Sequence, residues 1–184
     1  CHQINSNKKN RRSVVITLGA TSSPIDDIRH IQNTSSGKTG WGIAEHLHRH
    51  GHDVTCVAGI TTTQPPSWLP LVIHAPKPAQ MLKECKALSN DGIDAWVHAA
   101  AVLDYVVGAP ADGKIASQQG TLSLDLVESP KHIKELQDDC KESVRIGFKL
   151  EAGIKQKDLI YRAVAQIETS GMTAVVANRL EDLD

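Results

Sequence analysis

Ser13-Val14-Val15-Ile16-Thr17-Leu18-Gly19 is the stretch that decides the fold class. It is short, rich in β-branched residues and closed by glycine, which is typical of a buried strand. A turn-rich stretch follows over residues 20–37, and residues 38–49 then carry apolar side chains at helical spacing. Residues 53–58 repeat the strand pattern. The order strand, helix, strand predicts a β-α-β unit with parallel strands.

The same alternation continues along the chain. We predict further helices over 79–88, 130–141 and 156–169, strands over 94–100, 121–128, 144–150 and 173–177, and loops over 60–78 and 101–120. This rhythm predicts an α/β fold with a doubly wound, mostly parallel, Rossmann-like sheet and helices on both faces. Ligands of such sheets bind at the carboxyl ends of the strands, so the loops after Gly19, Ala100 and Phe148 should line one crevice.

Length and composition exclude several classes of protein. The 184 residues suffice for one domain with a core, so we expect a flexible polar arm over 1–12 and a single domain over 13–184. A net charge of -1 and 3% aromatic residues argue against a nucleic-acid partner, which needs a positive field or stacking surfaces. No apolar run approaches the length of a membrane span, so no membrane partner is expected.

Four widely spaced cysteines, Cys1, Cys56, Cys85 and Cys140, indicate reduced thiols and a cytoplasmic protein. His46 and His50 are spaced as zinc ligands can be, but they lie at the expected end of a helix, where histidine also favours the helix dipole. No further ligand stands nearby in a metal-binding pattern. We therefore expect no protein-held metal site.

The strongest chemical signal is Thr34-Ser35-Ser36-Gly37-Lys38-Thr39-Gly40, just before a predicted helix. Small residues let backbone amides approach an anion, and the helix N-terminus adds a partial positive charge. Ser35, Ser36 and Gly37 are therefore candidate phosphate contacts, and an ordinary serine-rich helix cap is the alternative. The segment is not a P-loop, because Gln32 stands where that motif needs glycine, and Gly19-Ala20-Thr21 does not fit G-x-G-x-x-G.

Four polar side chains in loops are further candidates. Arg29 and Asn33 precede the serine-rich segment, Asp104 follows a strand, and Lys114 lies in a glycine-bearing loop that suits a lid. A guanidinium suits a phosphate or carboxylate, and a strand-end carboxylate suits a ribose, base or metal. Considered one at a time, Arg29 is equally explained as a solvated residue and Asp104 as a loop cap, and Lys114 is better explained as a surface lysine.

Taken together, these segments resemble one family. The block Ile28–Gly40, followed in order by Ala100–Tyr105, Gly113–Ile115, Ile146–Leu150 and Val176–Asn178, resembles phosphopantothenoylcysteine synthetase, that is, phosphopantothenate–cysteine ligase. The resemblance covers about residues 13–180. It implies ligation of 4'-phosphopantothenate with L-cysteine in coenzyme A biosynthesis, through an acyl-nucleotide intermediate.

The resemblance also implies co-substrates and an assembly. CTP or ATP would serve as co-substrate with Mg²⁺, in a cytoplasmic homodimer. The flavin-dependent half of fused members has no counterpart here, so no flavin is expected. Residues 13–184 would be the nucleotide-binding synthetase domain, lacking a C-terminal segment that members of the family carry.

Residue roles follow from the same resemblance. Lys114 would stabilise phosphate charge as the acyl-nucleotide forms, and Asn33 with Arg29 would hold that intermediate for attack by cysteine. The implied nucleotide contacts are Gly19, Ser35, Ser36, Gly37, His98, Ala99, Ala100, Asp104, Ser129, Pro130, Lys131, His132 and Phe148.

The chain departs from the family pattern at two places. Ser129 stands where the family usually has asparagine, and the helix over 156–169 offers Arg162 and Gln166 where many bacterial members carry two lysines. A degenerate member that binds nucleotide without catalysis is therefore one alternative. A Rossmann-type NAD(P)-binding reductase is another, although the chain lacks G-x-G-x-x-G and the Tyr-x-x-x-Lys pair.

Overall fold

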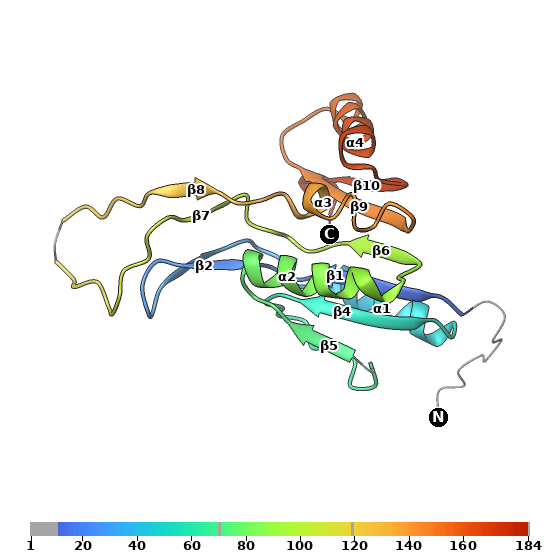
Figure 1. Ribbon diagram of the computed structural model, residues 1–184. Helices are drawn as coiled ribbons and strands as arrows, with labels where there is room; N and C mark the ends of the chain where they lie inside the picture. Colours follow the sequence, from blue (N-terminus) through green and yellow to red (C-terminus); the bar gives the residue numbers. More distant parts are fainter. Residues whose placement is uncertain (1–10, 70, 119, 184) are drawn as a thin grey trace.

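The computed structural model describes residues 11–69, 71–118 and 120–183. Six parallel strands form the central sheet in the order β10-β9-β6-β1-β4-β5 (Figure 1). Their bounds are β1 Ser13–Leu18, β4 Asp53–Ala58, β5 Leu71–His74, β6 Ala95–His98, β9 Val144–Glu151 and β10 Ala174–Arg179. The order reverses between β1 and β6, as in doubly wound sheets. The predicted α/β Rossmann-like fold is confirmed.

Helices cover both faces of the sheet. Helix α1 (Lys38–Arg49) buries Trp41 and Ala44 against Ile16 and Leu18 of β1. Helix α2 (Pro78–Leu88) buries Met81 and Cys85 on the other face, where the intervening side chains of β1 point. This alternation follows from the period of two in a strand. Helices α3 (His132–Glu135) and α4 (Gln156–Ser170) follow, with short 3₁₀ turns at Ser89–Asp91 and Leu180–Asp182.

Four short strands form an arm that runs out from the carboxyl ends of the sheet (Figure 1). Strand β2 (Ser22–Pro24) pairs antiparallel with β3 (His30–Gln32), and β7 (Tyr105–Val107) pairs antiparallel with β8 (Leu126–Glu128). The Val107 amide donates to Ser23 Oγ at 2.9 Å and joins the two pairs. Strands β2, β3 and β7 were expected as turns and loops, because three-residue strands carry too little periodicity to be recognised locally, whereas β8 lies within the strand predicted over 121–128.

Three other elements differ from the predictions. The apolar segment at 71–74, expected inside a loop, is the edge strand β5, and only 126–128 of the predicted strand over 121–128 is paired. The predicted helix over 130–141 is regular only from His132 to Glu135. There, Arg145 Nη2 donates to the Ile133 carbonyl at 2.6 Å, and the Gln137 amide donates to Lys134 instead. Arg145 thus binds the Ile133 carbonyl, which would accept from the Gln137 amide in a longer helix.

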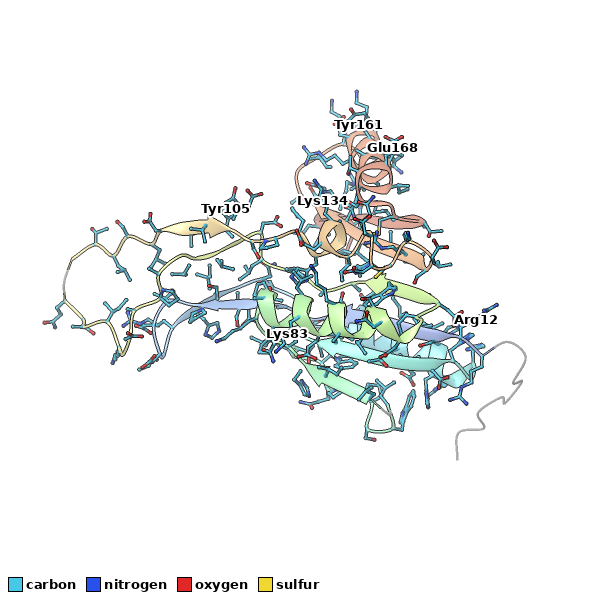
Figure 2. The ribbon with its side chains drawn as sticks, in the orientation of Figure 1. Arg12, Lys83, Tyr105, Lys134, Tyr161 and Glu168 are labelled. Atoms are coloured by element: carbon cyan, nitrogen blue, oxygen red, sulfur yellow. The ribbon has the colours of Figure 1, made fainter. Side chains whose placement is uncertain are left out.

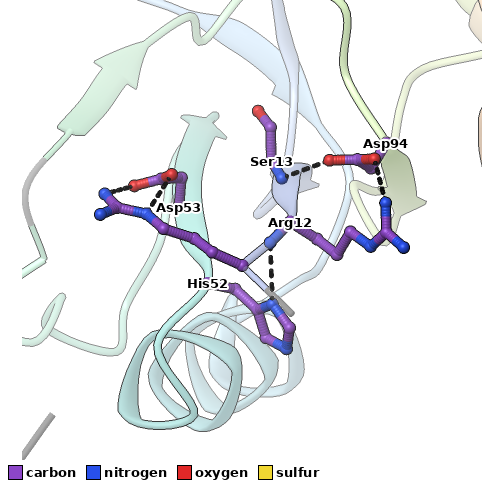
Figure 3. Close-up of polar contacts among 6 residues, drawn as sticks. Arg12, Ser13, His52, Asp53 and Asp94 are labelled. Atoms are coloured by element: carbon purple, nitrogen blue, oxygen red, sulfur yellow. Dashed lines mark hydrogen bonds and ion pairs between the residues drawn. The ribbon is translucent and has the colours of Figure 1, made fainter. Parts of the chain in front are cut away.

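The amino ends of the strands are joined by charged side chains (Figure 3). Arg11 binds Asp53 at the start of β4, and Asp94 accepts from the Ser13 amide at 2.8 Å and from Arg12 at 3.1 Å. The hydrogen bond from the Ser13 backbone amide, together with the Arg12 guanidinium, lowers the pKa of Asp94. These contacts therefore lie at the end of the sheet away from the predicted ligand crevice. Residues 1–10 of the flexible N-terminal segment predicted over 1–12 lie outside the described residues. The proposed domain boundary after residue 12 stays a prediction.

Among the described residues, no helix is long and apolar enough to cross a membrane. Cys56, Cys85 and Cys140 are free and buried, as expected for reduced thiols, and burial raises the pKa of Cys56 to about 12. These thiols are therefore protonated at neutral pH and poor nucleophiles. Cys1 lies outside the described residues.

Candidate functional site

A cavity of about 530 Å³ opens at the carboxyl ends of β1, β6, β9 and β10, and we call it the strand-end cavity. Residues 34–40, 98–102 and 148–150 line it, together with the turn at 130–133 and Asn178 of β10. The loops after β1, β6 and β9 were expected to line one crevice. The cavity contains most of the residues named for nucleotide binding: Ser35, Ser36, Gly37, His98, Ala99, Ala100, Asp104, Pro130, Lys131, His132 and Phe148.

Gly37 shapes the anion-facing side of this cavity. It precedes α1 with a left-handed φ of 77°, and no side chain caps the helix there. A Cβ at Gly37 would lie 2.5 Å from Thr61 Cγ2 and 3.3 Å from Trp41 Nε1, so only glycine fits. The first amides of a helix have no partner within it, and Ser36 Oγ accepts only from the Lys38 amide, at 3.3 Å. The remaining first-turn amides suit an anion.

His98 ends β6 on the floor of the strand-end cavity, with 7% of its surface exposed. Burial lowers its pKa to about 3, and the charges of Arg145 and His132 act in the same direction. The imidazole is therefore neutral at physiological pH. Its buried Nε2 has no hydrogen-bond partner in the part of the chain that the structure describes, which suits a hydrogen bond to a bound molecule.

The turn at 129–132 forms the wall opposite α1. The Ser129 amide donates to the Asp104 carbonyl at 2.8 Å, and Lys131 Nζ lies 2.7 Å from Asp104 Oδ1. These bonds hold the turn against the segment that follows β6. Ser129 itself is 5% exposed and lines a different cavity on the far side of the turn. Of the four residues named at this turn, three therefore face the strand-end cavity.

Three lysines, Lys38, Lys131 and Lys149, line the strand-end cavity, and Asp104 is its one acidic lining residue among those described. Lys131 pairs with Asp104 at 2.7 Å and Lys149 pairs with Glu151 at 3.0 Å, whereas Lys38 forms no ion pair with a described residue. Helix α4 contributes Gln166, and Arg162 instead binds Glu151 at 2.7 Å. The missing lysines of α4 thus leave a neutral amide there, while cations reach the cavity from other elements. This charge balance suits a phosphate-bearing ligand.

Arg29 and the Lys114 loop lie together outside the strand-end cavity, at the turn of the β2–β3 hairpin that points away from the sheet. Arg29 Nη2 donates to the Ile115 carbonyl at 2.6 Å and pairs with Asp26 at 2.9 Å. Asp26, 3% exposed, also accepts from the amides of Ile28, Arg29 and Ile115. Burial alone would raise its pKa, but these amides and Arg29 hold the pKa below its usual value. Asp26 therefore fastens the Lys114 loop to Arg29.

Asn33 and Gly19 also lie outside the lining of the cavity. Asn33 is half-buried next to the lining residue Thr34, and its backbone amide donates to the Thr21 carbonyl at 3.4 Å. Gly19 has a φ of 77°, and its carbonyl accepts from Ala101 at 2.8 Å. A Cβ at Gly19 would meet Thr61 Cγ2 at 2.7 Å. Gly19 thus shapes the backbone beneath the cavity, and its predicted contact with nucleotide stays a prediction.

Sequence reasoning missed three residues that build the site. Thr61 packs against Gly19 and Gly37, and Asp26 braces the Lys114 loop. Arg145 is 1% exposed and donates to the carbonyls of Ser170 at 2.6 Å and Ile133 at 2.6 Å, which fixes the turn at 130–133 against α4. Only Asp26 had a local signal, since an aspartate two and three residues before unpaired amides is typical of a turn.

Comparison with known proteins decides the family. The family model described as DNA/pantothenate metabolism flavoprotein C-terminal domain matches residues 9–184. The chain belongs to this family. It is 39% identical over 171 residues to the coenzyme A biosynthesis bifunctional protein CoaBC of Thermococcus kodakarensis, covering 92% of this chain and 42% of that protein. The chain thus spans less than half the length of this relative.

Solved structures share the fold of this flavoprotein C-terminal domain. The crystal structure of the C-terminal domain of a CoaBC protein superposes with a TM-score of 0.76 at 25% identity, covering 92% of this chain and 77% of that one. The DNA/pantothenate metabolism flavoprotein from Streptococcus pneumoniae superposes with a TM-score of 0.85 at 23% identity, covering 94% and 84%. The second likeness concerns the fold alone.

Membership of the flavoprotein C-terminal domain family gives the placement of the motifs a context. Of the blocks that carried the resemblance, residues 34–40, 100–102, Asp104, 148–150 and Asn178 meet at the strand-end cavity. Residues 113–115 lie apart from it, held by Asp26 and Arg29. The site is therefore divided between a preformed cavity and a loop held at the turn of the β2–β3 hairpin.

Proposed function

We propose that this domain ligates 4'-phosphopantothenate with L-cysteine in coenzyme A biosynthesis, using CTP or ATP. The observation that carries the proposal is the strand-end cavity, which is lined by the start of α1 with Lys38, by Lys131 and Lys149 from other elements, and by one acidic residue among those described. A nucleoside triphosphate offers the anionic groups that these amides and cations recognise. The membership of the family and the likeness to CoaBC proteins support the same activity.

The first proposed step forms the acyl-nucleotide. A carboxylate oxygen of phosphopantothenate attacks the α-phosphorus of the triphosphate, the bond to the β-phosphate oxygen breaks, and pyrophosphate leaves. The amides after Gly37 and the lysines of the cavity hold the phosphates, while Phe148 and His98 contact the nucleoside. Lys114 is exposed on its loop and supplies charge to the developing phosphate when that loop closes over the site.

The second proposed step transfers the acyl group. The amine of cysteine attacks the acyl carbon, the bond to phosphate breaks, and the nucleoside monophosphate leaves as the amide forms. Asn33 lies next to the cavity and donates its side-chain amide to the acyl group, and Arg29 lies near the substrate anion. Both residues keep the intermediate in a reactive position, which raises the rate by lowering the entropy cost of the encounter.

Mg²⁺ fits this cavity only through the nucleotide. Asp104 is the acidic lining residue, and it already binds Lys131 at 2.7 Å. Among the described residues, no group of three histidine, cysteine or acidic side chains is placed to hold a metal. Mg²⁺ commonly binds one or two carboxylates together with substrate phosphates, so Asp104 and the triphosphate would hold it. The ion would neutralise phosphate charge; the proposal assigns no flavin to the chain.

We extend the proposal to a cytoplasmic homodimer. The arm carries exposed apolar side chains on Tyr105, Leu122, Leu126 and Val127, with 48–55% of their surfaces accessible. Apolar groups concentrated on one projection are typical of an interaction surface. Arg29 and Lys114 lie on the same arm, at the turn of the β2–β3 hairpin, so pairing of two arms would bring a second chain close to these residues.

A specific observation favours nucleotide binding without catalysis as the second candidate. Helix α4 places Gln166 in the cavity, and Arg162 is engaged by Glu151. Of the lysines that line the cavity, Lys131 and Lys149 are already paired with Asp104 and Glu151, which weakens the grip on the outer phosphates. This candidate predicts nucleotide affinity with no turnover.

One experiment separates these candidates. Purified protein is incubated with CTP or ATP, Mg²⁺, phosphopantothenate and cysteine, and pyrophosphate and the amide product are measured by enzyme-coupled assay and mass spectrometry. Ligation predicts pyrophosphate release that requires phosphopantothenate, and product that also requires cysteine. Nucleotide binding without either signal would leave the non-catalytic candidate. Tight binding of NADPH in place of CTP and ATP would contradict both.

A further inference from the structure

A second cavity, of about 600 Å³, lies between the start of α2 and the arm, and we call it the α2 cavity. Its apolar walls come from Pro24, Leu82, Val106, Val107 and Pro110. Cavities of this size with mostly apolar walls bind small organic molecules. The turn at 129–132 separates this cavity from the strand-end cavity, and Pro130 and His132 line both.

The rim of the α2 cavity is positively charged. Lys77, Lys83 and Lys86 line it, and Glu128 is its one acidic lining residue among those described. Lys86 is engaged by Glu135 at 3.5 Å, whereas Lys77 and Lys83 make no ion pair with any described residue. Lys83 lies on α2 (Figure 2). Exposed lysines can lay their stems on apolar walls while their ammonium groups meet an anion at the mouth.

The inner polar groups of this cavity are neutral at physiological pH. Ser129 and His132 are 5% and 7% exposed, and the His132 ring hydrogen-bonds the Pro78 carbonyl. Burial lowers the pKa of His132. A ligand that filled the cavity would thus place an uncharged body against apolar walls and neutral donors, and only its outer end would meet charge. A fully charged compact ion gains little from such walls.

We infer that the α2 cavity binds a small amphipathic anion, with an apolar chain or ring inside and a carboxylate, phosphate or sulfonate at Lys77 and Lys83. The inference rests on the cavity volume, the apolar walls and the two unpaired rim cations, and it does not depend on the proposed ligation. Occupancy would press on Pro130 and His132, which also line the strand-end cavity.

Anilinonaphthalene sulfonate is a suitable probe, because it joins an apolar ring system to one anionic group and fluoresces when its rings leave water. We expect saturable binding to the wild-type protein. Lys77→Glu combined with Lys83→Glu should weaken this binding about tenfold, since it reverses both rim charges. Lys141→Glu combined with Lys157→Glu changes the net charge equally at exposed positions outside the cavity, and it should leave binding within about twofold.

All four lysines are exposed, so the variants should unfold at the wild-type temperature; Lys83→Glu alone serves if the double variant does not fold. Equal probe affinity in the rim and control variants would overturn the inference. Complete displacement of the probe by CTP or ATP with competitive kinetics would also overturn it, because the probe would then lie in the strand-end cavity. Uncharged aminonaphthalene should bind more weakly than the sulfonate and respond little to the rim charges.

Discussion

Individual side chains in and around the strand-end cavity differ mainly in how firmly they are held. His98 is buried in one position, Asp104 and Lys131 hold one another across an exposed contact, and Lys114 lies on an exposed loop. His98 thus forms a fixed floor, whereas Lys114 lies outside the cavity and reaches it only when its loop moves, which would let the site bind a substrate first and stabilise charge later.

Lys114→Gln should abolish phosphopantothenate-dependent pyrophosphate release, lowering it at least about 100-fold, because a preorganised charge on the phosphates is lost. Thermal unfolding should not change, since Lys114 is exposed. Lys141→Gln removes an equally exposed lysine elsewhere and should retain full activity. Full activity in Lys114→Gln would show that the loop has no part in the reaction.

Acidification should destabilise the protein through His98. Its folded pKa of about 3 lies below the unfolded value near 6.5, so between these values the unfolded state binds more protons. The free energy of unfolding is therefore highest above pH 6.5 and falls below it, with a slope from this group approaching about 1.4 kcal/mol per pH unit. Urea unfolding from pH 4.5 to 7.5 measures the slope.

His98→Asn should flatten this dependence, although not fully, because burial also lowers the pKa of His132. His50→Asn, at an exposed position on the end of α1, should leave the slope as it is. An unchanged slope in His98→Asn would contradict the buried neutral state of His98.

At the scale of elements, the start of α1 and the end of α4 are held by two different devices. Thr61 packs so closely against Gly37 that a Cβ would not fit there, so the backbone conformation before α1 requires glycine at position 37. Arg145 instead uses a buried charge to satisfy carbonyls at the end of α4 and in α3. One device therefore depends on packing and the other on hydrogen bonding.

Gly37→Ala should lower the free energy of unfolding by about 1–3 kcal/mol and weaken nucleotide binding, because alanine is strained at positive φ and meets Thr61. Thr61→Ala added to Gly37→Ala should restore the part of the lost free energy of unfolding that comes from the contact with Thr61. The part that comes from the positive φ should remain lost. Gly42→Ala is the matched control, since its Cβ would meet nothing within 4 Å, and it should stabilise α1 by about 0.5–1 kcal/mol. If the free-energy changes of Gly37→Ala and Thr61→Ala are additive in the double variant, the alanine at position 37 does not clash with Thr61.

Arg145→Met should cost about 3 kcal/mol, because it leaves buried carbonyls of Ser170 and Ile133 without donors. Arg162→Met removes an exposed arginine of α4 that pairs with Glu151, and it should cost less than about 1 kcal/mol. Urea unfolding compares the two. Equal small losses would mean that water satisfies the carbonyls that Arg145 now binds.

On the scale of the whole molecule, the sheet and the arm have opposite surfaces. The sheet is covered by helices on both faces, whereas the arm leaves leucine, valine and tyrosine side chains exposed. Apolar side chains on a slender projection add nothing to the stability of a lone chain. The arm is consequently where we expect a second chain to bind.

Sedimentation should show a dimer at micromolar concentration, and Leu124→Lys with Leu126→Lys should shift it to a monomer, because two charges would be buried in the interface. Both side chains are exposed in the lone chain, so the unfolding temperature of the monomer should not fall. Ile160→Lys, at an exposed apolar position on α4, is the control and should remain dimeric. A wild-type monomer would remove the proposed role of the arm.

By itself, the sequence determined the α/β class, five of the six strands of the central sheet and the blocks around Gly37, Ala100 and Phe148, because strand and helix periodicity are local properties. It did not determine the edge strand β5. It did not reveal the arm, whose short strands form only through pairing of distant segments. It also did not separate Lys114 and Arg29 from the residues that line the cavity.

Only the tertiary structure decided those placements, since burial and backbone contact depend on neighbours from other parts of the chain. Thr61 against Gly37, Asp26 across to Ile115 and Arg145 under Ile133 are contacts between separate elements. The same holds for the α2 cavity, which exists because α2 and the arm meet at the carboxyl end of the sheet.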